Sequence, residues 1–240
     1  MQLFIVLAAC FAAAFAQSPA KKLEETLISI RDQMPCGFPD WGLPPLAPLQ
    51  GDYFNLYHKL WILQINGGAS DFLIEGLNDF DISNVNLNVL TLKLNMDLNF
   101  NKIHAKGKYF IESFIISPLK LKGKGTFDIN LTDLSIKIYG RIGMVDGILR
   151  LMDLDVVIGL DGMKSKITGL VGPLGTLVLS SIVDKVIVGF IADNQEALTD
   201  NIREILLPQI NNLLKDFTIS DVLQLLQNSP EFPPCVAKAA

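Results

Sequence analysis

Few residues in this chain combine the side-chain types and spacing that catalysis or metal binding requires. Asp153 and Asp155 are close enough in sequence to act as paired carboxylates, but no third group is placed to work with them, so we interpret both as solvated surface residues. The two histidines, His58 and His104, are too few for a histidine-based metal site. His58 lies in an aromatic-rich stretch and is expected to pack or to face solvent. His104 precedes a turn signal and is expected to be exposed.

The chain also lacks the short motifs that position a nucleophile or a phosphate group. It contains no Gly-x-Ser-x-Gly elbow, no Walker loop and no Gly-x-Gly-x-x-Gly segment after a strand. Gly123-Lys124-Gly125 is too short for a phosphate loop, and we interpret it as a turn between strands. We therefore expect no catalytic residue, no metal and no cofactor, and the chain is not predicted to be an enzyme.

Charge and composition argue against a nucleic-acid-binding protein and against a disordered chain. The 240 residues include 20 Lys and Arg against 25 Asp and Glu, a formal net charge of −5. A nucleic-acid partner is not expected, because such proteins need cationic side chains to replace phosphate counterions. Half of the residues are hydrophobic and 19% are charged, which is typical of a globular chain and not of a disordered one. The length allows one elongated domain or two small ones.

The first sixteen residues have the pattern of a secretory signal. Residues 1–16 carry no charged side chain and end in Ala14-Phe15-Ala16, the small-x-small sequence that signal peptidase accepts. A membrane anchor is the alternative, but a spanning helix needs about 20 residues. We therefore expect cleavage before Gln17, an extracellular location, and a mature domain over residues 17–240.

Export to an oxidising compartment predicts one disulfide in the mature chain, between Cys36 and Cys235. Cys10 leaves with the signal, and Cys36 and Cys235 remain near opposite ends of the mature chain. A disulfide between them would close a loop of about 200 residues and stabilise the fold by about 5 kcal/mol. The alternative is two free or intermolecular thiols. The one glycosylation sequon, at Asn130, lies in an alternating segment that we expect to be a paired strand, which argues against its occupancy.

The N-terminal part of the mature chain predicts one helix and one extended segment. Apolar positions between Lys21 and Arg31 have helical spacing, so a short amphipathic helix is expected there. Residues 35–49 contain five prolines and are expected to be extended. Their large apolar side chains are expected to lie on an apolar surface: Phe38, Trp41, Leu43, Leu46 and Leu49.

From about residue 53 to 170, hydrophobicity alternates with period two. Residues 92–100 alternate strictly, and residues 85–89 alternate on the opposite parity, which predicts a bulge or bend at Val89–Leu90. Such runs separated by short turns are typical of an antiparallel meander. The expected turns are Lys106-Gly107, Lys122-Gly123-Lys124-Gly125, Gly140, Asp146-Gly147 and Asp161-Gly162.

The C-terminal third changes to helical spacing. Residues 174–191 are nearly all apolar, but Asp184 and Lys185 lie at the middle. A spanning helix would carry these charges at the bilayer centre at a cost of several kcal/mol, which favours a buried or groove-lining helix. Asn194 is the expected N-cap of a long amphipathic helix in which Pro208 produces a kink. The apolar stripe of that helix comprises Leu198, Ile202, Ile205, Leu206, Ile210, Leu213, Leu214 and Phe217.

The order of several short motifs resembles the insect takeout and haemolymph juvenile-hormone-binding family, which belongs to the tubular lipid-binding proteins. These motifs are the Gly42–Leu49 segment (GLPPLAPL), Ile74–Phe80 (IEGLNDF), Pro118–Gly125 (PLKLKGKG) and the helix core Ile205–Ile210 (ILLPQI). The resemblance covers roughly residues 20–227. It implies an α+β fold in which a strongly curved antiparallel β-sheet wraps a long C-terminal helix, forming an elongated single domain with an apolar tunnel.

The resemblance also implies a secreted carrier whose partner is a small hydrophobic ligand, such as an isoprenoid, a fatty acid or a similar lipid. No stable membrane insertion is expected, and protein partners stay unknown. A membrane- or lipopolysaccharide-engaging defence or interaction protein of the same fold is the alternative, and a lipid esterase is a third hypothesis without a visible nucleophile. Parity and helical spacing predict the tunnel lining as Leu94, Met96, Leu98, Phe127, Ile129, Ile136, Ile138, Phe190, Ile202 and Ile210.

Overall fold

The computed structural model describes residues 19–39, 42–59, 63–88, 91–116, 119–171, 176–216, 218 and 235. In this part of the chain, seven strands form one antiparallel sheet with the order β1-β2-β4-β5-β6, where β3 pairs with β4 and β7 pairs with β5. The elements are α2 (Pro19–Gln33), β1 (Leu49–Lys59), β2 (Leu63–Glu75), β3 (Phe80–Asn88), β4 (Lys93–Ile116), β5 (Leu119–Val145), β6 (Ile148–Ile167), β7 (Leu170–Val171), α3 (Thr176–Asp193) and α4 (Gln195–Leu214).

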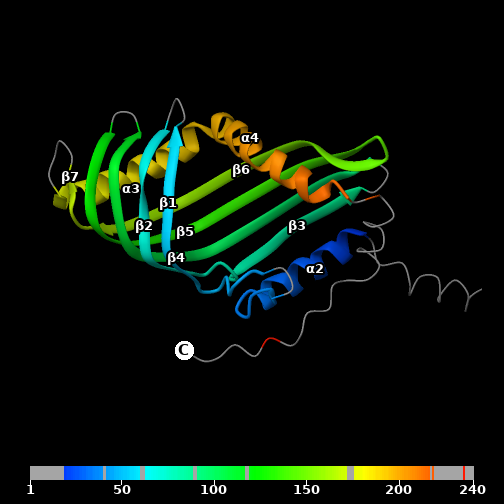
Figure 1. The fold of residues 1–240 in the computed structure, drawn as a ribbon, viewed down its shortest axis with the longest axis horizontal. Coiled ribbons are helices and arrows are strands. Elements are labelled where there is room, and N and C mark those ends of the chain that lie inside the picture. The colour runs from blue at the N-terminus through cyan, green and yellow to red at the C-terminus, as the bar shows by residue number, and fades with distance from the viewer. Residues whose placement is uncertain are drawn as a thin grey trace, which may run out of the picture.

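The sheet is elongated and strongly curved, and the C-terminal helices lie along it (Figure 1). Both α3 and α4 contact β6, and α2 contacts β3. The predicted α+β fold, a curved antiparallel sheet around C-terminal helices, is therefore confirmed. The helical region is divided in two at Asn194, between α3 and α4.

Halfway along the long strands, the residues that face the inner side of the sheet change from odd-numbered to even-numbered positions. Leu131 and Leu134 both pack against the cluster formed by Phe80, Phe100 and Ile103, although a flat strand brings every second residue to one face. Asp133 lies between them with a positive φ of 51°, and the register with both neighbouring strands omits it. The distortion turns the strand over, so odd residues face the sheet's inner side before Asp133 and even residues face it afterwards.

Most glycines that we predicted to be turns lie inside strands. Gly107 is in β4, Gly140 is in β5 and Gly162 is in β6. Only Asp146-Gly147 forms a turn, with positive φ at both residues (54° and 82°), which suits a two-residue hairpin. The turns predicted at the other glycines were therefore wrong, because three long strands of 24, 27 and 20 residues run through these positions.

Gly123 and Gly125, another predicted turn, lie in β5 where the chain between β6 and β7 approaches closely. A Cβ atom at Gly125 would lie 2.1 Å from the Thr168 carbonyl oxygen, and one at Gly123 would lie 2.2 Å from the Gly169 carbonyl oxygen. These glycines are required by backbone proximity and not by chain reversal.

Replacing Gly125 with alanine is expected to lower the free energy of unfolding by about 2 kcal/mol, because the added methyl overlaps backbone that cannot move freely. Gly189→Ala is the matched control: this residue lies in α3 and a Cβ there meets nothing within 4 Å. The control is expected to raise the free energy of unfolding by about 0.5–1 kcal/mol. Urea unfolding of both variants measures the difference, and equal stabilities would contradict the close approach at Gly125.

A bulge or bend was predicted at Val89–Leu90. The two residues lie outside the described part of the chain, but the segments on either side are separate antiparallel strands, β3 and β4. In their register Val85 is opposite Met96 and Leu87 is opposite Leu94. Because paired residues share a face, an odd residue of β3 lies beside an even residue of β4, and this register explains the opposite parities.

The predicted N-terminal helix and the predicted long C-terminal helix are both present, but the N-cap and the buried stripe of the C-terminal helix differ from the prediction. The helix expected near Lys21–Arg31 is α2. Asn194 is at the N-cap position of α4, but its side chain does not cap the helix, since Nδ2 donates to the Phe190 carbonyl oxygen at 2.9 Å. Pro208 lies inside α4. Ile205 and Leu206 are exposed and do not belong to the buried stripe as predicted.

The proline-rich segment after α2 is only partly packed. Phe38 is 4% exposed and forms an isolated bridge with Leu43, whereas Leu43 itself is 44% exposed, which contradicts its predicted burial. Trp41 lies outside the described residues. Cys36, in the same segment, forms a disulfide with Cys235, so two positions 199 residues apart in sequence are joined.

Candidate ligand-binding cavity

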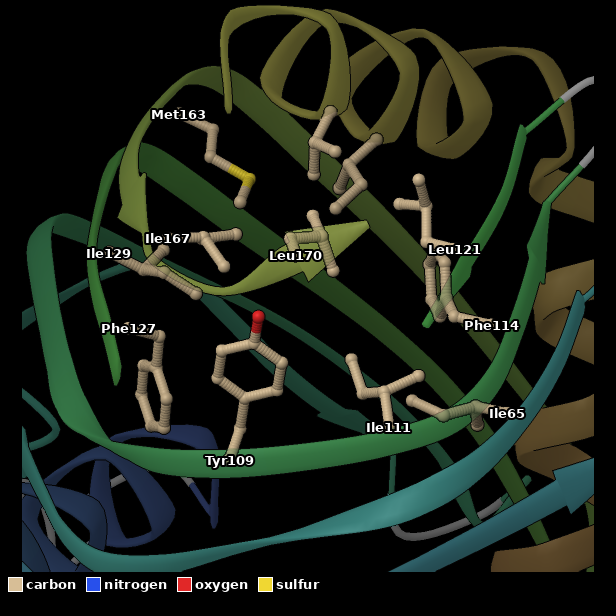
Figure 2. Close-up of a pocket in the computed structure, with 12 residues that line it drawn as sticks. Ile65, Tyr109, Ile111, Phe114, Leu121, Phe127, Ile129, Met163, Ile167 and Leu170 are labelled. Carbon is tan, nitrogen blue, oxygen red and sulfur yellow. The ribbon is translucent and has the colours of Figure 1, made fainter. Parts of the chain in front are cut away.

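A cavity of about 220 Å³ lies between the curled end of the sheet and α3 (Figure 2). Five strands and one helix contribute to its wall, so side chains from distant parts of the chain converge there. The lining residues are Ile65, Tyr109, Ile111, Phe114, Leu121, Phe127, Ile129, Met163, Ile167, Leu170, Val183 and Ile187.

The cavity wall is hydrocarbon and thioether except for one phenol. Tyr109 is 7% exposed, and its hydroxyl donates a hydrogen bond to the Thr168 carbonyl oxygen at 2.7 Å. Burial raises the pKa of Tyr109 above its ordinary value, so the phenol stays neutral at physiological pH. Since the single hydroxyl donor is already used, the cavity is suited to apolar groups.

Helix α3 closes one side of the cavity, and a carboxylate holds it to β6. Val183 is 4% exposed and packs with Tyr109 and Leu170. The next residue, Asp184, accepts hydrogen bonds from the Ser165 backbone N–H at 3.1 Å and the Ser165 hydroxyl at 2.6 Å. The charge at the centre of this apolar helix therefore anchors it beside the strand that carries Met163 and Ile167.

Two of the ten predicted lining residues, Phe127 and Ile129, line this cavity. Phe190 packs against the cluster formed by four of the lining residues, Tyr109, Leu121, Leu170 and Val183. The other seven lie along the second half of the sheet. Leu98 and Ile136 pack with Phe80 and Phe100. The cluster of Leu151, Leu154 and Val156 is contacted by Ile136, Ile138, Ile202 and Ile210. In the β4–β5 register, Met96 is paired with Ile138 and Leu94 with Gly140.

Sequence reasoning missed ten lining residues. Leu121 continues the odd parity of Phe127 and Ile129 along β5, and this signal was available in the sequence. On β4, a register shift between Ile111 and Phe114 interrupts the alternation, so parity alone does not find both residues.

His104, one of the histidines considered for chemistry, is held within the sheet by two carboxylates. His104, predicted to be exposed before a turn, lies inside β4 with a side chain 25% exposed. Its ring nitrogens lie 2.9 Å from Glu75 Oε2 and 3.1 Å from Asp128 Oδ1, which ties it to β2 and β5. The side chain of His58 lies outside the description.

The acidic candidates have structural partners. Asp153 lies 3.6 Å from the Arg203 guanidinium, and Asp155 forms an ion pair with the same group. Among described residues, no group of three or more His, Cys, Asp or Glu side chains is arranged to hold a metal ion. Asn130 lies in β5, paired with His104 on one side and Lys164 on the other.

The sequence of the chain matches one protein family, and its structure is similar to two solved structures. The family described as haemolymph juvenile hormone binding protein matches residues 7–224. The solved structure of Epiphyas postvittana Takeout 1 is similar, with 18% sequence identity, a TM-score of 0.47, and coverage of 80% of this chain and 92% of that chain. A lipopolysaccharide binding protein matches with 18% identity, a TM-score of 0.31, and coverage of 79% and 39%. No curated protein matches the chain.

Proposed function

The chain belongs to the haemolymph juvenile hormone binding protein family, and we propose that it is a secreted carrier of a small hydrophobic ligand. The observation that carries this proposal is the cavity of about 220 Å³ whose single hydroxyl already donates to Thr168. An isoprenoid, a fatty acid or a similar lipid has the hydrocarbon portion that such a wall would accept.

The energetics favour a hydrocarbon guest of limited size. Each buried CH₂ group contributes about 0.8 kcal/mol, and after ordering and association costs a Kd between micromolar and nanomolar is reasonable. An apolar cavity of about 150 Å³ holds benzene, so the cavity here accepts a larger group but not the whole of a long chain. The remainder of a longer ligand would lie outside this cavity.

The proposed function includes export of the protein from the cell. Residues 1–16 would be removed as a signal peptide, leaving residues 17–240 as a single ligand-binding domain. The Cys36–Cys235 disulfide supports an oxidising, extracellular compartment. The described helices include none that is long and apolar enough to span a membrane.

Mass spectrometry of lipids that co-purify with the protein secreted by insect cells tests the carrier function. We expect hydrocarbon-rich molecules in a near-stoichiometric amount, and a delipidated sample that rebinds a fluorescent fatty acid. A sample that carries no lipid and fails to bind the probe would contradict the proposal. Turnover of a generic ester above that of a denatured control would favour the esterase hypothesis instead.

A further inference from the structure

The outer face of the sheet carries a row of lysines on β5, at the end of the sheet where β7 lies (Figure 1). Leu121 lines the cavity on the inner face, so Lys120 and Lys122, its neighbours in the strand, point away from the cavity. Lys124 follows on the same parity, and all three lysines are exposed. Because β5 is a central strand, protection of a sheet edge does not account for these charges.

The charge of this row is not neutralised by neighbouring carboxylates. In the part of the chain that the structure describes, none of the three lysines forms an ion pair. Two acidic residues of the neighbouring strands have other partners. Asp71 lies 2.8 Å from Lys108 Nζ, and Glu112 accepts a hydrogen bond from Asn66 Nδ2. The row is therefore available to an external anion.

The cationic surface continues along β4 and β6. Lys106 and Lys166 are both paired with Asp128 of β5, which has the parity of the lysine row, so they lie on the same outer face. Lys164 has the same parity as Lys166, and all three lysines are exposed. Asp128, the carboxylate between them, has its Oδ1 3.1 Å from His104 Nε2. Since charges are screened beyond about 8 Å in physiological salt, this end of the sheet presents positive charge although the whole chain carries −5.

Aromatic rings lie beside the lysine row on the same face. Phe110 of β4 is paired with Lys124, and its ring is nearly parallel to the ring of Tyr53, with an angle of 10° and centroids 6.3 Å apart. Tyr57 shares the parity of Tyr53 along β1, and these two tyrosines are 73% and 59% exposed, respectively. Tyrosine favours the membrane–water interface, where its ring enters the apolar zone. A sulfated polysaccharide has the negative charge but offers no such zone, so the combination of rings and lysines favours a membrane.

We propose that this surface, which we call the lysine face, docks the protein reversibly on membranes that contain anionic phospholipids. The lysine face is defined by Tyr53, Tyr57, Phe110, Lys120, Lys122 and Lys124. Its ammonium groups would bind lipid phosphates while its rings enter the interfacial layer, without crossing the membrane.

The lysine face adjoins the ligand-binding cavity. A surface recess of about 390 Å³ is lined in part by Lys120 and Lys122, and it shares Phe114 and Leu121 with the cavity wall. A carrier docked through these lysines would have this part of the cavity wall next to the lipid surface. Docking would therefore bring the carrier to the source or the destination of a hydrophobic cargo.

Co-sedimentation of the mature, disulfide-linked protein with vesicles tests the proposal. We expect the protein to pellet with vesicles that contain phosphatidylglycerol and to stay in the supernatant with phosphatidylcholine vesicles of the same acyl chains. Salt at about 1 M, where the screening length falls to about 3 Å, is expected to release it. The variant Lys120→Gln/Lys122→Gln/Lys124→Gln is expected to bind phosphatidylglycerol vesicles at least about tenfold more weakly, because each lysine near an anionic surface contributes about fivefold.

Lys93→Gln/Lys137→Gln/Arg141→Gln is the matched control. It removes the same charge from exposed positions at the other end of β4 and β5, and it is expected to bind within about twofold of the natural protein. Tyr57→Ser separates a membrane from a soluble polyanion. This variant is expected to bind phosphatidylglycerol vesicles about threefold more weakly and to be retained on heparin as the natural protein is.

Three outcomes would overturn the proposal: no pelleting of the natural protein with phosphatidylglycerol vesicles, equal binding of the lysine variant, or binding that about 1 M salt does not weaken. Retention on heparin without pelleting would also overturn it, and would assign the lysine face to a polyanion. Should the triple variant unfold by circular dichroism, Lys122→Gln alone provides the same test, with an expected loss of about fivefold. Binding of a fluorescent fatty acid in solution is expected to be unchanged in each variant, so a failure of docking is distinguishable from a failure of the carrier function.

Discussion

Replacing Ile129 with aspartate is expected to abolish ligand binding, weakening the affinity for a fluorescent fatty acid by at least about a hundredfold, or about 3 kcal/mol. Ile129 lies in β5 and lines the cavity, where no described cation or free donor faces the wall. An aspartate there either remains charged in an apolar environment or stays protonated and leaves a polar group without a partner, and both states oppose a hydrocarbon ligand. The same change is expected to lower the free energy of unfolding by about 3–5 kcal/mol.

Thr132→Asp is the matched control for this substitution. It introduces the same side chain in the same strand, at an exposed position. We expect this control to retain the natural affinity and to change the free energy of unfolding by no more than about 0.5 kcal/mol. Fluorescence titration gives the affinities, and urea unfolding gives the stabilities. Equal affinity of the folded Ile129→Asp variant and the natural protein would show that the ligand does not occupy this cavity.

The sequence alone was sufficient to predict the class of fold and the inner face of several strands. Alternation works there because each strand has one buried face. The predicted inward residues Phe127 and Ile129 precede the distortion at Asp133, and Ile136 and Ile138 follow it on the opposite parity. The turns were not predictable from glycine positions. Gly125 is needed for close contact with Thr168, and nothing local in the sequence distinguishes that requirement from a chain reversal.

The position of the cavity was less predictable than its chemistry. Parity assigns Phe127 and Ile138 equally to the inner face, yet Phe127 lines the cavity whereas Ile138 packs against Leu154 and its neighbours. The difference arises from the helices: α4 side chains such as Ile210 fill the second half of the sheet, while α3 leaves space beside Val183. That arrangement depends on contacts between segments far apart in sequence, which periodicity does not record.

Removing the Cys36–Cys235 disulfide is expected to have the second large effect, a loss of about 5 kcal/mol in the free energy of unfolding. The bridge joins residues 199 positions apart, and closing so long a loop removes much conformational entropy from the unfolded chain. For a protein of this size, such a loss corresponds to a decrease in Tm of about 10–20 °C. The double variant Cys36→Ser/Cys235→Ser avoids the free thiol that either single change would leave.

Thermal unfolding followed by circular dichroism measures this effect, with the natural protein in reducing agent as the matched comparison. Because the stabilisation acts through the unfolded chain, the reduced natural protein and the double variant should have the same Tm, and reducing agent should not change the Tm of the variant. Ligand affinity at low temperature should also be retained, since neither cysteine lines the cavity. A natural protein whose Tm shifts by less than about 2 °C on reduction would show that loop closure contributes little, and that packing between the sheet and the C-terminal helices is sufficient to hold the fold.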